Sequence, residues 1–345
     1  TVFRFAAGGG GKGMRKVDSP KDFIDSYNAA QREAKNAFGD DTIYMEKYIV
    51  NPKHIEIQIL ADEHGNCVHL AERDCSIQRR HQKVIEEAPS TVLDEKLREA
   101  MGKVAVDAAK ACNYVNAGTI EFLLDKDKKF YFLEMNTRLQ VEHPVSELIT
   151  GTDLAKEQIE IAAGYPLQFE QEDIVVSGHA IEVRIYAEDP LSNFMPDIGN
   201  ISYMRNPDGL GVRVDGGIER GDDVSINFDP MLAKLIVFGQ DREEAIDKMY
   251  AALCSYEIVG TRTIVPFLKA VMQSDRFRNH YFDTGFIEKD FEFKVLEEMK
   301  DKDEEDLAAI VAFMYNKNKY KKTSQAVIPT PNEWKSNRLK NMREI

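Results

Sequence analysis

The sequence lacks the features that would tie it to a membrane, a disulfide framework or a nucleic acid. Its four cysteines are far apart in the chain and form no Cys-x-x-Cys pair, so we expect reduced thiols rather than disulfides or a thiolate zinc site. No apolar run approaches the roughly 18 residues of a membrane span, and no charged-then-apolar leader is recognised. A net charge of −14 has the wrong sign for binding nucleic acid or an anionic membrane. These absences predict a cytoplasmic protein with neither kind of partner, in which a local site must hold any bound phosphate.

The length and the alternation of helical and β-rich segments predict a mixed fold. A chain of 345 residues suggests two or three packed units, and Thr1 begins a strand-like run, so we expect an N-terminal portion to be missing. Antiparallel hairpin signals favour an α+β fold over a doubly wound parallel sheet. Expected helices are 19–38, 94–112, 153–163, 241–257 and 263–273, and expected strands include 43–45, a half-buried strand at 55–59, two runs within 117–135, and 178–187.

The last 55 residues differ in character from the rest of the chain. An acidic stretch at 301–306 precedes an apolar helical segment at 307–315, and residues 317–345 form a basic tail with the sole tryptophan, Trp334. An aromatic side chain in a polar tail more often docks than remains free. We therefore expect an appended helix and a tail that contacts a partner or the body of the protein.

A glycine-rich loop lies near the start of the sequence. Residues 8–13 read GGGGKG and follow a strand, so their backbone amides could close over phosphate oxygens, with Lys12 and Arg15 adding positive charge. The loop matches neither the Walker A order nor the dinucleotide-binding order of glycines. A flexible hairpin tip is the alternative.

Two glutamates on either side of the polar turn at 125–129 indicate a cation site. Glu121 and Glu134 would face each other across the expected hairpin, and like charges in that arrangement are destabilising unless a cation such as Mg²⁺ lies between them. The alternative is a solvent-facing pair screened by Lys128 and Lys129. If residues 134–142 stay extended, then Asn136, Arg138, Gln140 and Glu142 project from the same face as Glu134, with Glu142 placed to act as a base.

A cationic segment at 72–83 concentrates positive charge in an acidic chain. Arg73, Arg79, Arg80, His81 and Lys83 could together attract a multiply charged anion. A surface segment paired with Glu72, Asp74, Glu86 and Glu87 explains the same pattern equally well.

Five ordered segments resemble the biotin carboxylase family of ATP-grasp ligases, and the resemblance extends from residue 1 to about residue 290. They are GGGGKGMR (8–15), YMEKYI (44–49), ERDCSIQRRHQK (72–83), EMNTRLQVEHP (134–144) and GHAIEVRIYAED (178–189). The resemblance implies an ATP-grasp fold with residues 1–48 in the lid subdomain, 49–175 in the catalytic subdomain and 176–290 in the biotin carboxylase C-terminal domain. Residues 291–345 would be the appended helix and tail.

The resemblance also implies a reaction and a set of site residues. Bicarbonate would attack the γ-phosphate of MgATP to give carboxyphosphate, whose carboxyl group passes to biotin on a carrier protein. The residues that would contact ATP are Arg4, Gly10, Gly11, Glu46, Lys47, Tyr48, Ile49, His54, His81, Glu121 and Glu134, and those that would bind Mg²⁺ or Mn²⁺ are Glu121, Glu134 and Asn136. The residues that would bind bicarbonate are Lys83, Arg138, Gln140, Val141 and Glu142. Arg184 would contact biotin. Lys83, Arg138, Glu142 and Arg184 would be the catalytic residues.

Two departures from the family pattern affect this interpretation. Arg4 stands where the family has a lysine, followed by Phe5-Ala6 in place of Ala-Ser, and arginine is planar and bulkier than lysine. The family's N-terminal subdomain is absent from the sequence. The alternatives are another ATP-grasp carboxylate ligase and a non-catalytic nucleotide-binding subunit.

The sequence contains no Ala-Met-Lys-Met biotinylation motif and no acyl-CoA transferase region. We therefore expect the biotin carboxyl carrier protein and the carboxyltransferase on other chains, and the resemblance implies a homodimer. The acceptor, whether acetyl-CoA, propionyl-CoA or pyruvate, would be set by those partner subunits.

Overall fold

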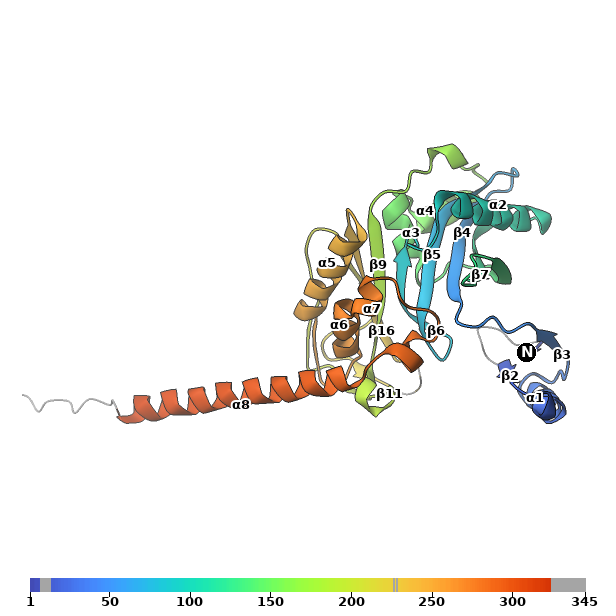
Figure 1. The fold of residues 1–345 in the computed structure, drawn as a ribbon. Coiled ribbons are helices and arrows are strands. Elements are labelled where there is room, and N and C mark those ends of the chain that lie inside the picture. The colour runs from blue at the N-terminus through green and yellow to red at the C-terminus, as the bar shows by residue number, and fades with distance from the viewer. Residues whose placement is uncertain (7–13, 226, 228, 324–345) are drawn as a thin grey trace, which may run out of the picture. The chain divides into compact units, whose positions relative to one another are not determined.

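A computed structural model describes residues 1–6, 14–225, 227 and 229–323. The chain divides into two units, Thr1–Glu292 and Phe293–Ile345. The first unit contains two larger antiparallel sheets with their covering helices, and the described part of the second unit forms helix α8 (Lys294–Thr323) (Figure 1). The expected mixed fold with antiparallel pairing is therefore confirmed.

A three-stranded sheet forms the N-terminal part of the first unit. Its central strand β1 (Val2–Phe5) pairs with β2 (Met14–Lys16) and β3 (Ile43–Glu46). The Ser19 side chain accepts a hydrogen bond from the Lys21 amide and begins the 3₁₀ turn that leads into α1 (Phe23–Phe38), as the Ser-Pro signal predicts. One face of β1 packs on α1, so the alternation along the strand directs Arg4 to the other face.

An eight-stranded antiparallel sheet forms the larger part of the first unit. The strand order is β14-β16-β9-β6-β5-β4-β7-β8. In chain order the strands are β4 (Lys53–Ala61), β5 (Cys67–Arg79), β6 (Gln82–Ala88), β7 (Asn116–Leu124), β8 (Phe130–Asn136), β9 (His179–Tyr186), β14 (Val212–Gly216) and β16 (Met231–Gly239). The strands of this sheet come from residues before and after residue 175. The expected boundary at this residue, between the catalytic subdomain and the C-terminal domain, stays a prediction.

Strand β4 is buried on both faces, so the expectation of a half-buried strand at 55–59 is wrong. Ile55, Ile57 and Ile59 pack against α2 (Glu95–Ala111), whose N-cap is Asp94. Glu56 and Gln58 on the other face are also fully buried. A polar face of this kind must be matched by polar partners inside the protein, because burying an unpaired charge is costly.

The remaining helices pack against strands of the large sheet or against one another. The helices are α3 (His143–Thr150), α4 (Leu154–Ala162), α5 (Arg242–Ser255), α6 (Val265–Gln273) and α7 (Asp275–Arg278), and the short strands are β10 (Glu188–Asp189), β11 (Met195–Pro196), β12 (Gly199–Asn200), β13 (Tyr203–Arg205), β15 (Asp223–Val224) and β17 (Glu257–Val259). Helix α5 packs against β9 and β16, and α6 packs against α5 (Figure 1). The helices expected at 153–163, 241–257 and 263–273 are thereby confirmed.

The hairpin β7–β8 pairs Glu121 with Glu134, as predicted, but through an irregular register. Phe122 lies opposite Phe132, so an even register would set Glu121 against Leu133; a shift between Glu121 and Phe122 brings Glu134 opposite instead. The Asp125 carboxylate closes the turn by accepting from the amides of residues 127 and 129. A one-residue register shift therefore makes this pair of carboxylates possible.

The expected extended run from 134 to 142 is wrong. Strand β8 ends at Asn136, a turn follows, and Glu142 is the N-cap of α3. The alternation argument therefore does not hold for Arg138, Gln140 and Glu142. The chain turns back at this point, and these side chains reach the site from a loop.

Helix α8 in the second unit contains the predicted apolar segment 307–315. Its apolar side chains, including Leu307, Ile310, Val311 and Met314, are exposed. Residues 324–345, with Trp334, and residues 7–13, with the whole glycine loop, lie outside the described part of the chain. Among the helices of the described residues, none is both long and apolar enough to cross a bilayer.

Candidate active site

A cavity of about 340 Å³ opens between the three-stranded sheet and the polar face of the large sheet. All the predicted site residues within the described part of the chain line it: Arg4, Glu46, Lys47, Tyr48, Ile49, His54, His81, Lys83, Glu121, Glu134, Asn136, Arg138, Gln140, Val141, Glu142 and Arg184. Gly10 and Gly11 fall outside the described residues. Side chains that are up to 180 positions apart in sequence thus meet in one place.

Lys83 lies at the centre of the polar face of the large sheet. Its Nζ donates to Glu121 Oε1 at 2.8 Å, to Glu142 Oε1 at 2.6 Å and to Glu56. Burial alone would lower the pKa of Lys83, but Glu56 and Glu142 raise it well above its ordinary value. Lys83 is therefore a fixed cation that holds three carboxylates together.

Glu142 connects Lys83 to Arg184. Its second carboxylate oxygen, Oε2, accepts from Arg184 Nη2 at 2.9 Å, and the Nε of Arg184 donates to Glu86 at 2.7 Å. Burial and Glu56 favour the neutral acid, yet Lys83 and Arg184 prevail and lower the pKa of Glu142. Glu142 is thus an ionised carboxylate, able to take a proton once one of these cations turns to a substrate.

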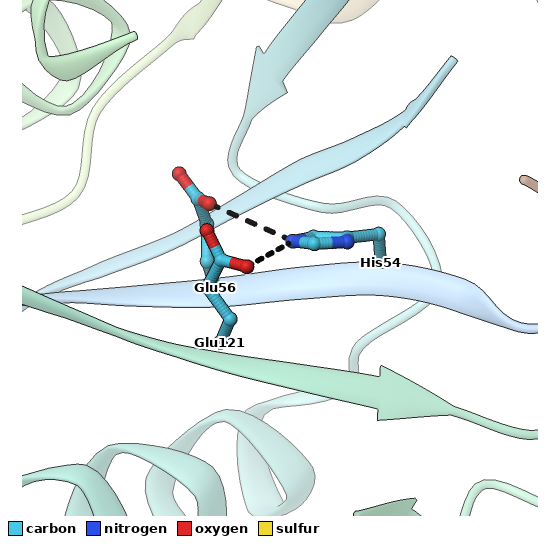
Figure 2. A group of neighbouring side chains, drawn as sticks. All are labelled: His54, Glu56 and Glu121. Carbon is cyan, nitrogen blue, oxygen red and sulfur yellow. Dashed lines mark ion pairs between the residues drawn. The ribbon is translucent and has the colours of Figure 1, made fainter. Parts of the chain in front are cut away.

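Behind Lys83, His54, Glu56 and Glu121 form a compact buried group (Figure 2). His54 Nε2 lies 3.2 Å from Glu121 Oε2 and 3.8 Å from Glu56 Oε2. Burial would raise the pKa of both carboxyls, but Arg73 and Lys83 lower that of Glu56 to about 2, and His54 and Lys83 lower that of Glu121. Both groups are therefore ionised at neutral pH.

The residues present fit a divalent metal ion on the Glu134 side of this group. His54, Glu56 and Glu121 have ligand atoms within 4.8 Å of one another, but Lys83 already neutralises both carboxylates. Glu134 faces Glu121 across the hairpin, and the side-chain amide nitrogen of Asn136 donates a hydrogen bond to Glu121 Oε1 at 3.0 Å. Two carboxylates and an amide oxygen are the donors that Mg²⁺ prefers.

Arg138 differs from the other cations that line the cavity. Its exposed guanidinium donates to the Leu139 carbonyl and forms no ion pair with any described residue. Next to it, Gln140 donates to Glu121, and the Val141 carbonyl accepts from Lys234. The loop that follows β8 thus offers an uncommitted, planar anion-binding group beside Glu142.

The three-stranded sheet covers the hairpin side of the cavity. Arg4 is buried, and its guanidinium bridges Glu46 at 3.4 Å and Glu134 at 3.3 Å. Lys47, Tyr48 and Ile49 continue the cavity wall after β3. The arginine that departs from the family pattern therefore contacts a candidate metal ligand.

The expected cationic cluster at 72–83 does not form a single anion site. Arg73 is fully buried beneath the cavity, Arg79 pairs with Glu188, and only Lys83 and His81 line the cavity. The alternative of a surface segment is also wrong, because Arg73 pairs with Glu56, and Glu86 and Glu87 face Arg184 and Arg242. Successive residues of a strand point to opposite faces, so a run of charges is distributed among different environments.

Sequence reasoning missed Glu56, Arg73 and Lys234 as parts of this site. Arg73 donates to five side chains, namely those of Glu56, Gln58, Thr119, Gln140 and Ser146. The alternation of Glu56 and Gln58 with isoleucines was the available signal, but it reads equally well as a solvent-facing strand. Lys234 gave no signal in the sequence.

The buried Arg73–Glu56 pair yields a test of the site's foundation. Changing Arg73 to Met is expected to lower the free energy of unfolding by about 3–5 kcal/mol, because Glu56 and four polar side chains lose a buried partner. Arg213→Met is the matched control, since that guanidinium pairs with Glu147 and Asp215 while 40% exposed, and we expect a cost of about 0–1 kcal/mol. Equal costs in chemical denaturation would contradict this assignment.

Family comparisons agree with the geometry. Residues 1–170 match the family model described as carbamoyl-phosphate synthase L chain, ATP binding domain, and residues 182–289 match the biotin carboxylase C-terminal domain. A pyruvate carboxylase subunit of Methanothermobacter thermautotrophicus is 52% identical over 83% of this chain and 58% of its own length. The mouse mitochondrial propionyl-CoA carboxylase alpha chain is 53% identical over 83% of this chain and 40% of its own length.

Solved structures are similar over the same region. The Campylobacter jejuni biotin carboxylase β-γ-ATP complex has a TM-score of 0.81 at 48% identity, covering 83% of this chain and 64% of that one. The biotin carboxylase domain dimer of Hydrogenobacter thermophilus 2-oxoglutarate carboxylase, with MgADP, ADP and bicarbonate, also has a TM-score of 0.81. It is 47% identical, and the match covers 84% of this chain and 64% of that one. These coverages mean that this chain spans about two fifths to two thirds of the length of each of these proteins. With both domain models matched in order and the cavity residues brought together, the chain belongs to the biotin carboxylase family of ATP-grasp proteins.

Proposed function

We propose that this chain catalyses the ATP-dependent carboxylation of protein-bound biotin with bicarbonate, as the biotin carboxylase subunit of an acyl-CoA carboxylase or a related carboxylase. One observation carries the proposal: ionised Glu142 lies between Lys83 and Arg184 in a cavity where Arg138 has no ion pair among the described residues. A base flanked by cations is the arrangement needed to bind a small oxyanion and remove its proton.

The first step uses the bicarbonate side of the site. Bicarbonate binds to Arg138 and Lys83, which shifts hydrogen bonds of Lys83 from Glu142 to the substrate and raises the basicity of Glu142. Glu142 takes the bicarbonate proton, the oxygen attacks the γ-phosphorus, and the bond from that phosphorus to ADP breaks. Holding the reactants in line supplies much of the rate.

The second step transfers the carboxyl group. The carbon–oxygen bond of carboxyphosphate breaks, a carbon–nitrogen bond to the biotin ureido nitrogen forms, and the departing phosphate takes the proton that this nitrogen loses. Arg184 stabilises the enolate oxygen of biotin, because its guanidinium is held beside Glu142 at the reacting end of the cavity.

Nucleotide and metal are assigned to the other residues that line the cavity. Glu46, Lys47, Tyr48, Ile49, His54 and His81, which line the cavity, are assigned to the nucleotide, and Arg4 to its phosphates. Gly10 and Gly11, which lie outside the described residues, are assigned to the phosphates from the sequence pattern alone. Glu121, Glu134 and Asn136 would hold Mg²⁺ or Mn²⁺, and such an ion neutralises charge on the β- and γ-phosphates.

The role of Glu142 is tested by ADP release from the purified chain with Mg²⁺, ATP and free biotin, with and without bicarbonate. We expect bicarbonate-dependent release that falls about 10²–10⁴-fold in Glu142→Gln, because the amide cannot accept the proton. Glu147→Gln is the matched control on the same helix, since Glu147 does not line the cavity and should keep most of the rate. Release that ignores bicarbonate and Glu142 would overturn the proposal.

Arg4 favours a second candidate function, a nucleotide-binding subunit without catalysis. Its guanidinium contacts Glu134 and so competes with a metal ion for that carboxylate. If the chain is catalytic, Arg4→Lys should bind MgATP at least as tightly as wild type, while Arg4→Gln binds about tenfold more weakly from losing a charge-assisted contact. Calorimetry at fixed Mg²⁺ measures both. Equal affinity of Arg4→Gln and wild type would exclude phosphate binding by Arg4.

Partners follow from the same proposal. The carrier protein presents biotin, a carboxyltransferase subunit consumes carboxybiotin, and the chain forms a homodimer, by analogy with the dimeric 2-oxoglutarate carboxylase domain. We assign residues 318–345 to docking because Trp334 lies among basic residues.

Deleting residues 318–345 should weaken co-elution with the carrier and carboxyltransferase subunits, and unchanged assembly would contradict this role.

A further inference from the structure

Two buried glutamates face each other behind Arg184. Glu86 on β6 and Glu182 on β9 are directly opposite in the antiparallel register, and both are fully buried. Side chains in such positions lie about 5 Å apart, where like charges repel strongly. A pair of this kind requires a counter-ion or a proton.

Glu182 has no hydrogen-bond partner on either carboxylate oxygen, and Glu86 has none on Oε2. The sole hydrogen bond of the pair to a described side chain is the one that Arg184 donates to Glu86 Oε1. An ionised carboxylate buried in this way would bear the full cost of desolvation.

Glu87, the next residue on β6, shows the contrast. Glu87 and His179 also lie between β6 and β9, but His179 Nε2 bonds Glu87 at 2.9 Å, and Arg242 donates to both oxygens of Glu87. Burial opposes charge at Glu87, yet Arg242 and His179 lower its pKa. Glu87 is thus fully compensated by His179 on β9 and Arg242 on α5, whereas Glu182 on β9 has no hydrogen-bond partner.

The cations around the pair are committed to other groups. Arg184 is shared with Glu142, Lys83 with three carboxylates, and Lys234 lies against the Val141 carbonyl and 3.5 Å from Asp215. The titratable and charged groups that act on the pair are Cys75 on β5, Lys83 on β6, Arg184 and Tyr186 on β9, Lys234 on β16, and Glu142 at the start of α3. No uncommitted cation remains among them to neutralise Glu182.

We propose that Glu182 is a positioning residue held as the neutral acid, sharing its proton with Glu86, and that this proton keeps Arg184 directed at Glu142. With one proton, the pair carries a single negative charge, which the Nε of Arg184 satisfies, and Nη2 remains for Glu142. Without the proton, two carboxylates on the face of Arg184 would draw the guanidinium away from the site.

The direction of the shifts agrees with this arrangement. Burial and the proximity of Glu86 raise the pKa of Glu182 well above its ordinary value, and burial raises the pKa of Glu86 to about 7 despite Arg184. Both pKa values lie above that of an exposed glutamate, so the folded pair binds protons that the unfolded chain releases near pH 4.5, and loss of the Glu86 proton near pH 7 leaves the shared proton on the pair. The pair therefore lowers stability progressively as the pH rises from about 4.5 through about 7.

Infrared spectroscopy of protein labelled with ¹³C-carboxyl glutamate tests the shared proton directly. At about pH 8, exposed glutamates are ionised and the pH is above the pKa of about 7 of Glu86, so we expect one protonated-carboxyl band that shifts with the label. Glu182→Gln should remove the band. Glu87→Gln is the matched control on the neighbouring register pair and should retain it. If Glu182→Gln does not fold, Glu86→Gln serves instead, and the band should then move in position.

Two outcomes would overturn the inference. Absence of a labelled acid band from the wild type would show that both carboxyls are ionised. A band that survives unchanged in Glu182→Gln and Glu86→Gln, or that is lost in Glu87→Gln, would place the proton elsewhere.

The consequence for Arg184 rests on the proposed function and has a separate readout. The rate of biotin-dependent ADP release should fall as the pH rises through the ionisation of the pair. In Glu182→Gln the pH profile should lack this fall. If Glu182 were merely structural, the substitution would instead lower the rate equally at every pH. Equal pH profiles would contradict the positioning role. If no ADP release occurs at all, the proposed function fails while the infrared result still decides the shared proton.

Discussion

The buried ammonium of Lys83 is the contact on which the rest of the site depends. Glu56, Glu121 and Glu142 converge on it from β4, β7 and the start of α3. Three carboxylates in a buried setting would repel one another and lose their hydration, so they require cations at close range. Lys83, with Arg73 below and Arg184 beside it, provides that compensation, and the polar face of the sheet can therefore be buried.

This arrangement links the fold to the chemistry. The antiparallel order of the large sheet places β9, β6, β5, β4, β7 and β8 side by side, so residues distant in sequence meet on one face. The cations that stabilise Glu142 also suppress its basicity until an anion draws them away. Arg138, which has no ion pair among the described residues, is the group that can begin this exchange. In the proposed reaction, the same electrostatic compensation that holds the site together becomes substrate recognition when an anion binds.

Much of the architecture and of the site could be predicted from the sequence. Helix caps such as Asp94 and Asp153 act locally, so those boundaries agree with the structure. The facing of Glu121 and Glu134 was also predictable, although the register shift that achieves it leaves no mark in the sequence. The five ordered motifs identified the residues that line the cavity, because a family resemblance carries information about the three-dimensional arrangement. Local sequence patterns carry no such information.

The failures share a physical cause. Glu56 and Gln58 alternate with isoleucines as a solvent-facing strand would, and only the sheet order reveals that both faces of β4 are buried. Arg73 looks like an anion-binding residue until its five partners from distant segments are known. The unpartnered state of Glu182 likewise depends on strands that are close in space but far apart in sequence.

Oxygen transfer from bicarbonate to phosphate tests the central claim most directly. If bicarbonate is the nucleophile that attacks the γ-phosphorus, then turnover with ¹⁸O-labelled bicarbonate in unlabelled water should yield inorganic phosphate with one labelled oxygen. The bond that forms between that oxygen and phosphorus stays intact when the carboxyl group leaves. Phosphate without the label would show that water is the attacking group and would contradict the assignment of Lys83, Arg138 and Glu142 to bicarbonate.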